Sequence, residues 1–175
     1  AYAGDLKGNM WKFDLRADDA DDWKVYYNDG SPQPLVRVMN TDGDFQPITA
    51  APEVMLDCAK STFAANGTGV MVLFGTGRYL NSDDFDDISS QSLYGIWDWG
   101  DIWEEISGGD TTGYEVAKTM FLGEVQSDYT LSNITGPTLQ QQTSTTSGQW
   151  LTFSDNALSW FNPEDSTGSH MGWVY

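Results

Sequence analysis

The chain has 175 residues and carries 8 Lys and Arg against 26 Asp and Glu, which gives a formal charge of −18 at neutral pH. This length corresponds to one domain or part of one, and 39% apolar with 14% aromatic residues excludes a chain that is disordered by composition. So few cations exclude a nucleic-acid-binding protein, and the sequence contains no apolar run of about 18 residues that would predict a membrane-spanning helix.

The first predicted element is a β-hairpin over residues 2–15. Trp11 and Phe13 alternate with charged residues, which is the period-two pattern of a half-buried strand. Gly8 and Asn9 suit the turn because both residue types tolerate a positive φ.

Further strands are predicted along the first half of the chain. Residues 35–39 form a candidate strand, and residues 46–56 are extended because two prolines exclude a helix there. Residues 69–75 form a short apolar run bounded by glycines, which favours a buried strand over a helix.

The second half begins with a candidate strand over residues 92–98. The spacing of Trp99, Trp103 and Ile106 then allows a short helix near residues 101–106. Beyond it, a Ser-, Thr-, Gln- and Asn-rich stretch indicates exposed strands and turns, and the last residues again look like a strand. Short strands with frequent glycine turns predict an all-β propeller, sandwich or barrel.

Four motifs narrow this choice, at residues 2–15, 46–52, 73–80 and 91–98. In this order they resemble the PilY family, proteins associated with the tip and biogenesis of type IV pili. The resemblance implies an all-β, quinoprotein-type β-propeller on an exported, pilus-associated protein that helps pili extend and contributes to surface attachment. The motif residues to which it gives a structural role are Gly4, Asp5, Gly8, Asn9, Trp11, Asp14, Gly75, Gly77, Arg78, Tyr79, Gln91, Tyr94, Gly95, Trp97 and Asp98.

The length bears on how much of such a propeller is present. A blade takes about 40–45 residues, so this chain corresponds to about four blades, fewer than such a propeller needs to close. We therefore expect residues 1–175 to be part of a single propeller domain, truncated at both ends or completed by another chain. The start at Ala1, without Met or a leader, is expected for a processed or trimmed chain.

The predicted function is non-enzymatic and works through protein interfaces in an extracellular, pilus-associated setting. The predicted partners are pilins or minor pilins, or further copies that pair with open strand edges. Two alternatives remain: a quinoprotein-like oxidoreductase fragment, and a secreted carbohydrate-binding or carbohydrate-active domain. The second rests on Glu104 and Glu105, which lie near Trp99 and Trp103 in the sequence.

No cofactor or metal ligand is predicted within the chain. The family often carries an acidic calcium loop just ahead of the first motif, so the resemblance implies calcium only through residues before Ala1. Residues 40–44 and 81–87 are acidic but lack the ligand spacing of a calcium loop, and we expect both to be solvated loops.

Catalytic signatures are also weak. Residues 75–77 read Gly-Thr-Gly without the third glycine of a dinucleotide loop, and His170 beside Ser169 is not a triad. Cys58, two residues before Lys60, is better interpreted as a small buried side chain than as an activated thiol.

In the first motif, Asp5, Asn9 and Asp14 are expected to hold turns by accepting backbone N–H bonds. Trp11 is expected to pack between adjacent blades.

Overall fold

The computed structural model describes all residues except 29, 57–69, 99–101, 107–112, 119–120 and 162–166, and it leaves undescribed the side chains of residues 28, 102–106, 113–118 and 135. The strands up to residue 98 are β1 (Tyr2–Gly4), β2 (Asn9–Asp14), β3 (Lys24–Val25), β4 (Tyr27–Asn28), β5 (Pro32–Gln33), β6 (Val36–Arg37), β7 (Glu53–Leu56), β8 (Val70–Gly75) and β9 (Leu93–Asp98). The strands after residue 98 are β10 (Ile102–Ile106), β11 (Gly113–Lys118), β12 (Thr130–Leu131), β13 (Ile134–Gln141), β14 (Ser144–Ser147), β15 (Trp150–Phe153) and β16 (His170–Val174).

The N-terminal sheet is built on the predicted hairpin, which is confirmed. β1 and β2 pair antiparallel with Ala3 opposite Trp11, and β2 also pairs with β3 and β6. Gly8 has a φ of 77°, and a Cβ at this position would lie 2.6 Å from the carbonyl oxygen of Val38. The turn therefore requires glycine both for its backbone conformation and for space.

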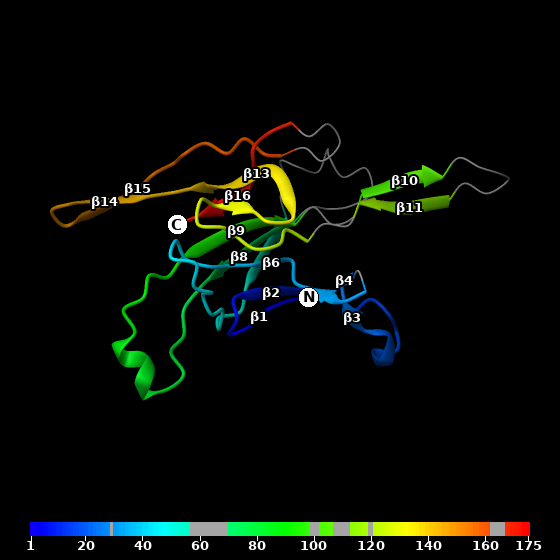
Figure 1. Ribbon diagram of the computed structural model, residues 1–175, viewed down its shortest axis with the longest axis horizontal. Helices are drawn as coiled ribbons and strands as arrows, with labels where there is room; N and C mark the ends of the chain where they lie inside the picture. Colours follow the sequence, from blue (N-terminus) through cyan, green and yellow to red (C-terminus); the bar gives the residue numbers. More distant parts are fainter. Residues whose placement is uncertain (29, 57–69, 99–101, 107–112, 119–120, 162–166) are drawn as a thin grey trace.

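The larger sheet has six strands in the order β12-β13-β16-β9-β8-β7 (Figure 1). β7, β8, β9 and β16 form an antiparallel set of four, the strand number of a propeller blade. β13 pairs parallel with β16 on the other side. The buried strands predicted over residues 69–75 and 92–98 correspond to β8 and β9.

A long connection interrupts the antiparallel set of four strands. The third and fourth strands of the antiparallel set, β9 and β16, are separated by residues 99–169, which include the hairpins β10–β11 and β14–β15. Among the described residues, two sheets have four or more strands, and the hairpins of this connection form two-stranded sheets of their own.

One apolar core joins the two sheets. Met10 and Val36 from the N-terminal sheet and Val72 and Ile96 from the larger sheet are all fully buried in the same cluster. Trp97 packs edge-on against Trp160, which itself forms an isolated parallel bridge to His170 of β16. Burial of this apolar surface is the main force that holds the sheets together.

Helix is almost absent from the described residues. It is confined to the 3-10 turns η1 (Ala20–Asp22) and η2 (Ser82–Asp86), and no described helix is long and apolar enough to cross a membrane. The short helix that the sequence allows near residues 101–106 is wrong, because Ile102–Ile106 is strand β10. Its backbone pairs antiparallel with β11, and pairing of this kind overrides a spacing that fits a helical face.

Candidate functional site

The first motif forms a turn centred on Asp5. Its carboxylate accepts the backbone N–H groups of Lys7 and Asn9, at 2.8 and 3.0 Å, and also the Trp11 indole N–H at 2.9 Å. Burial raises the pKa of Asp5, but these hydrogen bonds outweigh burial, so that its pKa is lowered overall. The charged carboxylate is therefore the form that holds the turn.

The other residues of this motif have different roles. Asp14 accepts the Arg16 backbone N–H and forms a two-pronged pair with the Arg16 guanidinium, whose hydrogen bonds lower the pKa of Asp14. Asn9 donates its side-chain amide to Asp5, whereas the sequence predicts an acceptor's role for it. Trp11 is half-buried, and a Cβ at Gly4 would overlap Ile48.

A buried ionic cluster connects the two sheets. Asp98, at the end of β9, is 2% exposed and lies 2.8 Å from the Lys12 ammonium of β2. The hydroxyl groups of Tyr2 and Tyr27 donate to the same carboxylate, at 2.5 and 3.1 Å. Burial, and then the Asp98 charge, raise the pKa of Tyr2, so the phenol remains protonated and donates. The sequence places Asp98 in a motif but does not identify these partners.

A second polar network fixes the ends of β8 and β9. The buried Tyr94 hydroxyl donates to Gln46 at 3.0 Å, and the Gln46 amide donates to the Ser90 carbonyl at 2.9 Å. Burial raises the pKa of Tyr94 to about 12. Gln91 accepts the Thr76 hydroxyl at 2.9 Å, so both ends of the intervening loop are held.

Residues 76–92 between β8 and β9 form a long connection, here called the 76–92 loop, which extends away from the sheets (Figure 1). Asp84 orders it from within, since its carboxylate accepts Arg78 Nε and the backbone N–H of Leu80, both at 2.7 Å, and the Asn81 N–H at 3.1 Å. These backbone bonds and the Arg78 pair lower the pKa of Asp84. Asn81 also caps η2.

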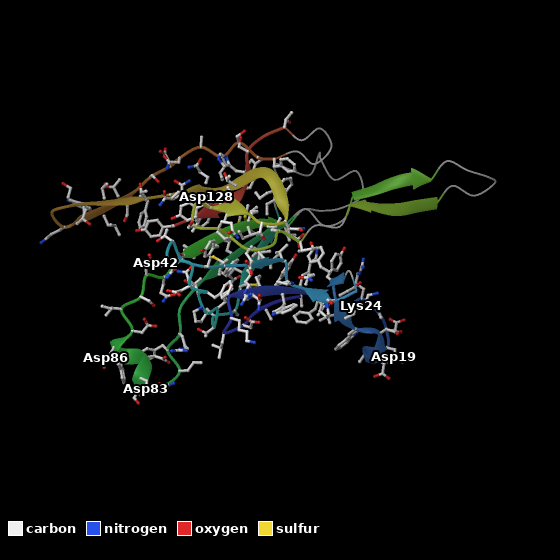
Figure 2. The ribbon with its side chains drawn as sticks, viewed as in Figure 1. Asp19, Lys24, Asp42, Asp83, Asp86 and Asp128 are labelled. Atoms are coloured by element: carbon white, nitrogen blue, oxygen red, sulfur yellow. The ribbon has the colours of Figure 1, made fainter. Side chains whose placement is uncertain are left out.

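This order corrects the prediction that residues 81–87 are simply a solvated loop. Asp84 is 4% exposed and serves as an internal anchor, while Asp83, Asp86 and Asp87 remain exposed. Figure 2 shows Asp83 and Asp86 at the outer end of the loop. Long loops with their own internal structure are frequently functional.

The ordered 76–92 loop presents apolar side chains to solvent. Tyr79 and Phe85 are each 67% exposed and contact each other edge-to-face with ring centroids 5.1 Å apart. Leu80 and Ile88 are exposed as well. An apolar cluster with acidic residues at its margin has the composition of a protein interaction surface.

The two glycines of the rejected nucleotide motif lie at the base of this loop. Gly75 ends β8, and apart from its own chain neighbours no atom lies within 4 Å of the position a Cβ would take there. Gly77 has a φ of 127°, and its N–H donates to the Pro47 carbonyl at 2.7 Å. The pair therefore serves a strand end and a turn.

Residues 40–44 and His170, two further candidates from the sequence, make local hydrogen bonds. Asn40 accepts the N–H groups of Asp42 and Asp44, so residues 40–44 are a side-chain-stabilised turn. His170 Nδ1 accepts the Ser159 N–H at 2.9 Å, and burial lowers the pKa of His170. Within the described residues, no group of three or more His, Cys, Asp or Glu is placed to hold a metal ion.

The candidates for carbohydrate contact and for a reactive thiol cannot be placed. Cys58 and Trp99 lie outside the described residues. Trp103, Glu104 and Glu105 belong to β10, whose side chains are also outside the description.

Residues 1–115 match the family model of the PilY1 beta-propeller domain. The chain is 32% identical, over 99% of its length, to the type IV pilus biogenesis factor PilY1 of Pseudomonas aeruginosa strain PAO1. It is 39% identical, over 57% of its length, to a PilY1 homolog of Xylella fastidiosa. The chain spans 14% and 6% of the length of these two relatives.

A solved structure agrees with this match. The crystal structure of the P. aeruginosa PilY1 C-terminal domain superposes with a TM-score of 0.65 and 28% sequence identity. The superposition covers 99% of this chain and 34% of that one. The predicted all-β, propeller-like fold is therefore confirmed.

Proposed function

The chain belongs to the PilY1 β-propeller family, and from this premise we propose that it is part of a type IV pilus biogenesis factor that acts through protein interfaces. The proposal is supported by the names of its relatives and by the ordered apolar surface of the 76–92 loop. It places the protein outside the cell, at the pilus or the cell surface, and it requires no catalysis. The same proposal includes a contribution of this protein to the attachment of cells to surfaces.

The observation that carries the proposed interface is the internal anchor of the 76–92 loop. Buried Asp84 accepts three nitrogen donors, and this holds Tyr79 and Phe85 in place while both remain 67% exposed. A loop that is ordered before binding loses less conformational entropy when a partner docks. We assign pilins or minor pilins as these partners.

The extent of the domain is proposed on the same basis. The solved relative is aligned over only 34% of its chain. Further segments of the same protein, or another chain, would then complete a single propeller that contains residues 1–175.

We expect the triple variant Tyr79→Ser, Phe85→Ser and Ile88→Ser, made in the intact protein, to reduce surface pili at least tenfold. Anchor residues at interfaces each contribute more than about 1 kcal/mol, so the loss of three is large. Pili sheared from cells would be quantified against the intracellular pilin pool. Asp84→Asn should give the same direction of change, because it disorders the loop without removing an exposed apolar side chain.

The control is Leu15→Ser with Trp23→Ser, since these side chains are 43% and 50% exposed and lie outside the 76–92 loop. Immunoblots would establish that all variants accumulate equally. Normal piliation in the triple variant would reject this loop as the interface.

A further inference from the structure

A pocket lies at the base of the β14–β15 hairpin, apart from the 76–92 loop. In Figure 1 this hairpin extends from the body of the molecule near the C-terminus. The pocket has a volume of about 390 Å³, which is within the range of small-ligand sites. Its lining residues are Leu93, Gln142, Phe153, Ser154, Asp155, Asn156, Leu158, Trp173 and Tyr175.

The polar lining residues hold the pocket in shape. The Gln142 side-chain oxygen accepts the Ser154 hydroxyl at 2.7 Å and the Asn156 N–H at 3.0 Å. The Gln142 amide donates to the Asn156 carbonyl, and the Asn156 amide donates to the Gln141 carbonyl, both at 2.9 Å. These amides are thus used to join the segment after β15 to the end of β13.

The aromatic walls are fixed as well. Phe153 and Tyr175 contact each other edge-to-face with ring centroids 5.2 Å apart. The Tyr175 hydroxyl donates to the Ser144 hydroxyl at 2.5 Å. The backbone N–H of Tyr175 donates to the carbonyl of Leu93, and the N–H of Leu93 donates to the carbonyl of Tyr175. Phe153 is nevertheless 56% exposed, so its ring remains accessible to a ligand.

The chemistry of the lining points to a cation. Three aromatic residues, Phe153, Trp173 and Tyr175, line the pocket together with the acidic Asp155, and the lining contains no Lys, Arg or His. Aromatic faces attract cations through their quadrupole, and a carboxylate adds to that attraction. The same chain uses this interaction elsewhere, with Lys12 Nζ 3.8 Å from the ring centroid of Tyr26.

The charge of the chain decides which kind of molecule carries that cation. A second copy would bring the same charge of −18 and would be repelled. An anionic lipid surface or a nucleic acid is disfavoured for the same reason. A protein segment with an exposed Arg or Lys is complementary both to the pocket and to the field around it.

We propose that this pocket binds the cationic side chain, guanidinium or ammonium, of an Arg or Lys on a partner protein. The identity of the partner as a pilus component rests on the proposed function, whereas the chemistry of the pocket does not. The cation would lie against the aromatic wall that Phe153 and Tyr175 form, with Asp155 in the same lining.

The test uses the intact protein and capped amino acids as probes: N-acetyl-arginine methylamide, the lysine equivalent, and the citrulline and leucine equivalents as neutral controls. Binding is measured by saturation-transfer NMR and by titration. We expect both cationic probes to bind, and citrulline, which has nearly the shape of arginine without its charge, to bind at least tenfold more weakly. Increased salt should weaken binding of the cationic probes.

Two variants locate the binding. Phe153→Leu keeps an apolar wall but removes the ring face, and Asp155→Asn removes the charge with little change in shape. Each should weaken arginine binding about 2- to 30-fold. Both positions are exposed, so the fold should survive, and Trp23→Leu and Asp18→Asn are the matched exposed controls.

Three outcomes would overturn the proposal. Equal binding of citrulline or leucine would make the pocket an apolar site, and unchanged affinity in both variants would place the binding elsewhere. Absence of binding by every probe would mean that another part of the intact protein fills the pocket. None of these results depends on the 76–92 loop variants, whose piliation assay tests the proposed function separately.

Discussion

Asp98→Asn is expected to loosen the junction between the two sheets by about 3 kcal/mol, because it leaves the Lys12 ammonium largely buried without its counter-charge. The side chains of Lys12 and Asp98 are only 13% and 1% exposed, so water compensates little. Hydrogen exchange of the β2 and β9 amides, followed in the intact protein by mass spectrometry, should accelerate on the order of a hundredfold.

Two further variants separate charge from shape in this cluster. Adding Lys12→Met to Asp98→Asn removes the unpaired charge and should recover most of the lost protection. Asp14→Asn breaks the Asp14–Arg16 pair, in which the Arg16 side chain is 76% exposed, and should change exchange only severalfold. If Asp98→Asn left β2 and β9 protected to within twofold of the unmodified protein, the cluster would not hold the sheets together.

Gly95→Ala is the second substitution with a large expected effect. A Cβ on Gly95 would overlap the indole ring of Trp173 on the neighbouring strand β16. Forcing a methyl group into a packed contact costs about 1–3 kcal/mol. We therefore expect faster hydrogen exchange across the pairing of β9 with β16, by about 5- to 100-fold.

Gly75→Ala is the matched control for this substitution. Gly75 ends β8, has no positive φ, and apart from its own chain neighbours has no atom within 4 Å of where its Cβ would lie. The alanine variant should stay within about 0.5 kcal/mol of the unmodified protein. Similar effects of the two substitutions would contradict the steric explanation.

Much of the fold could be predicted from local patterns. The hairpin at residues 2–15 could be predicted because the alternation of apolar and charged residues and the residues of the turn both indicate it. Gly8 in the turn indeed has a positive φ. β8 could also be predicted, because a short apolar run between glycines fits a buried strand. β10 could not be predicted, since its pairing with β11 is a tertiary contact that the spacing of Trp103 and Ile106 does not encode.

The candidate sites were less predictable, because they depend on residues far apart in the sequence. Lys12 and Asp98 lie about half the length of the chain apart in the sequence, so the motif alone could not pair them. The role of Asp84 was also missed: a run of carboxylates is usually solvated, and only the fold shows which one turns inward to Arg78. Asn81 three residues before Asp84 is the capping-box spacing, and this local signal could have identified the turn.

The most direct test of the central claim is site-specific photo-cross-linking from position 85 in the 76–92 loop, in cells that make pili. A photoreactive phenylalanine analogue there replaces an exposed ring, so the fold should be unaffected. Position 15, which is exposed outside this loop, is the control. Our account predicts cross-links to a pilin or minor pilin from position 85 and far fewer from position 15. Capture of no pilus component from position 85, in a protein that still supports piliation, would contradict it.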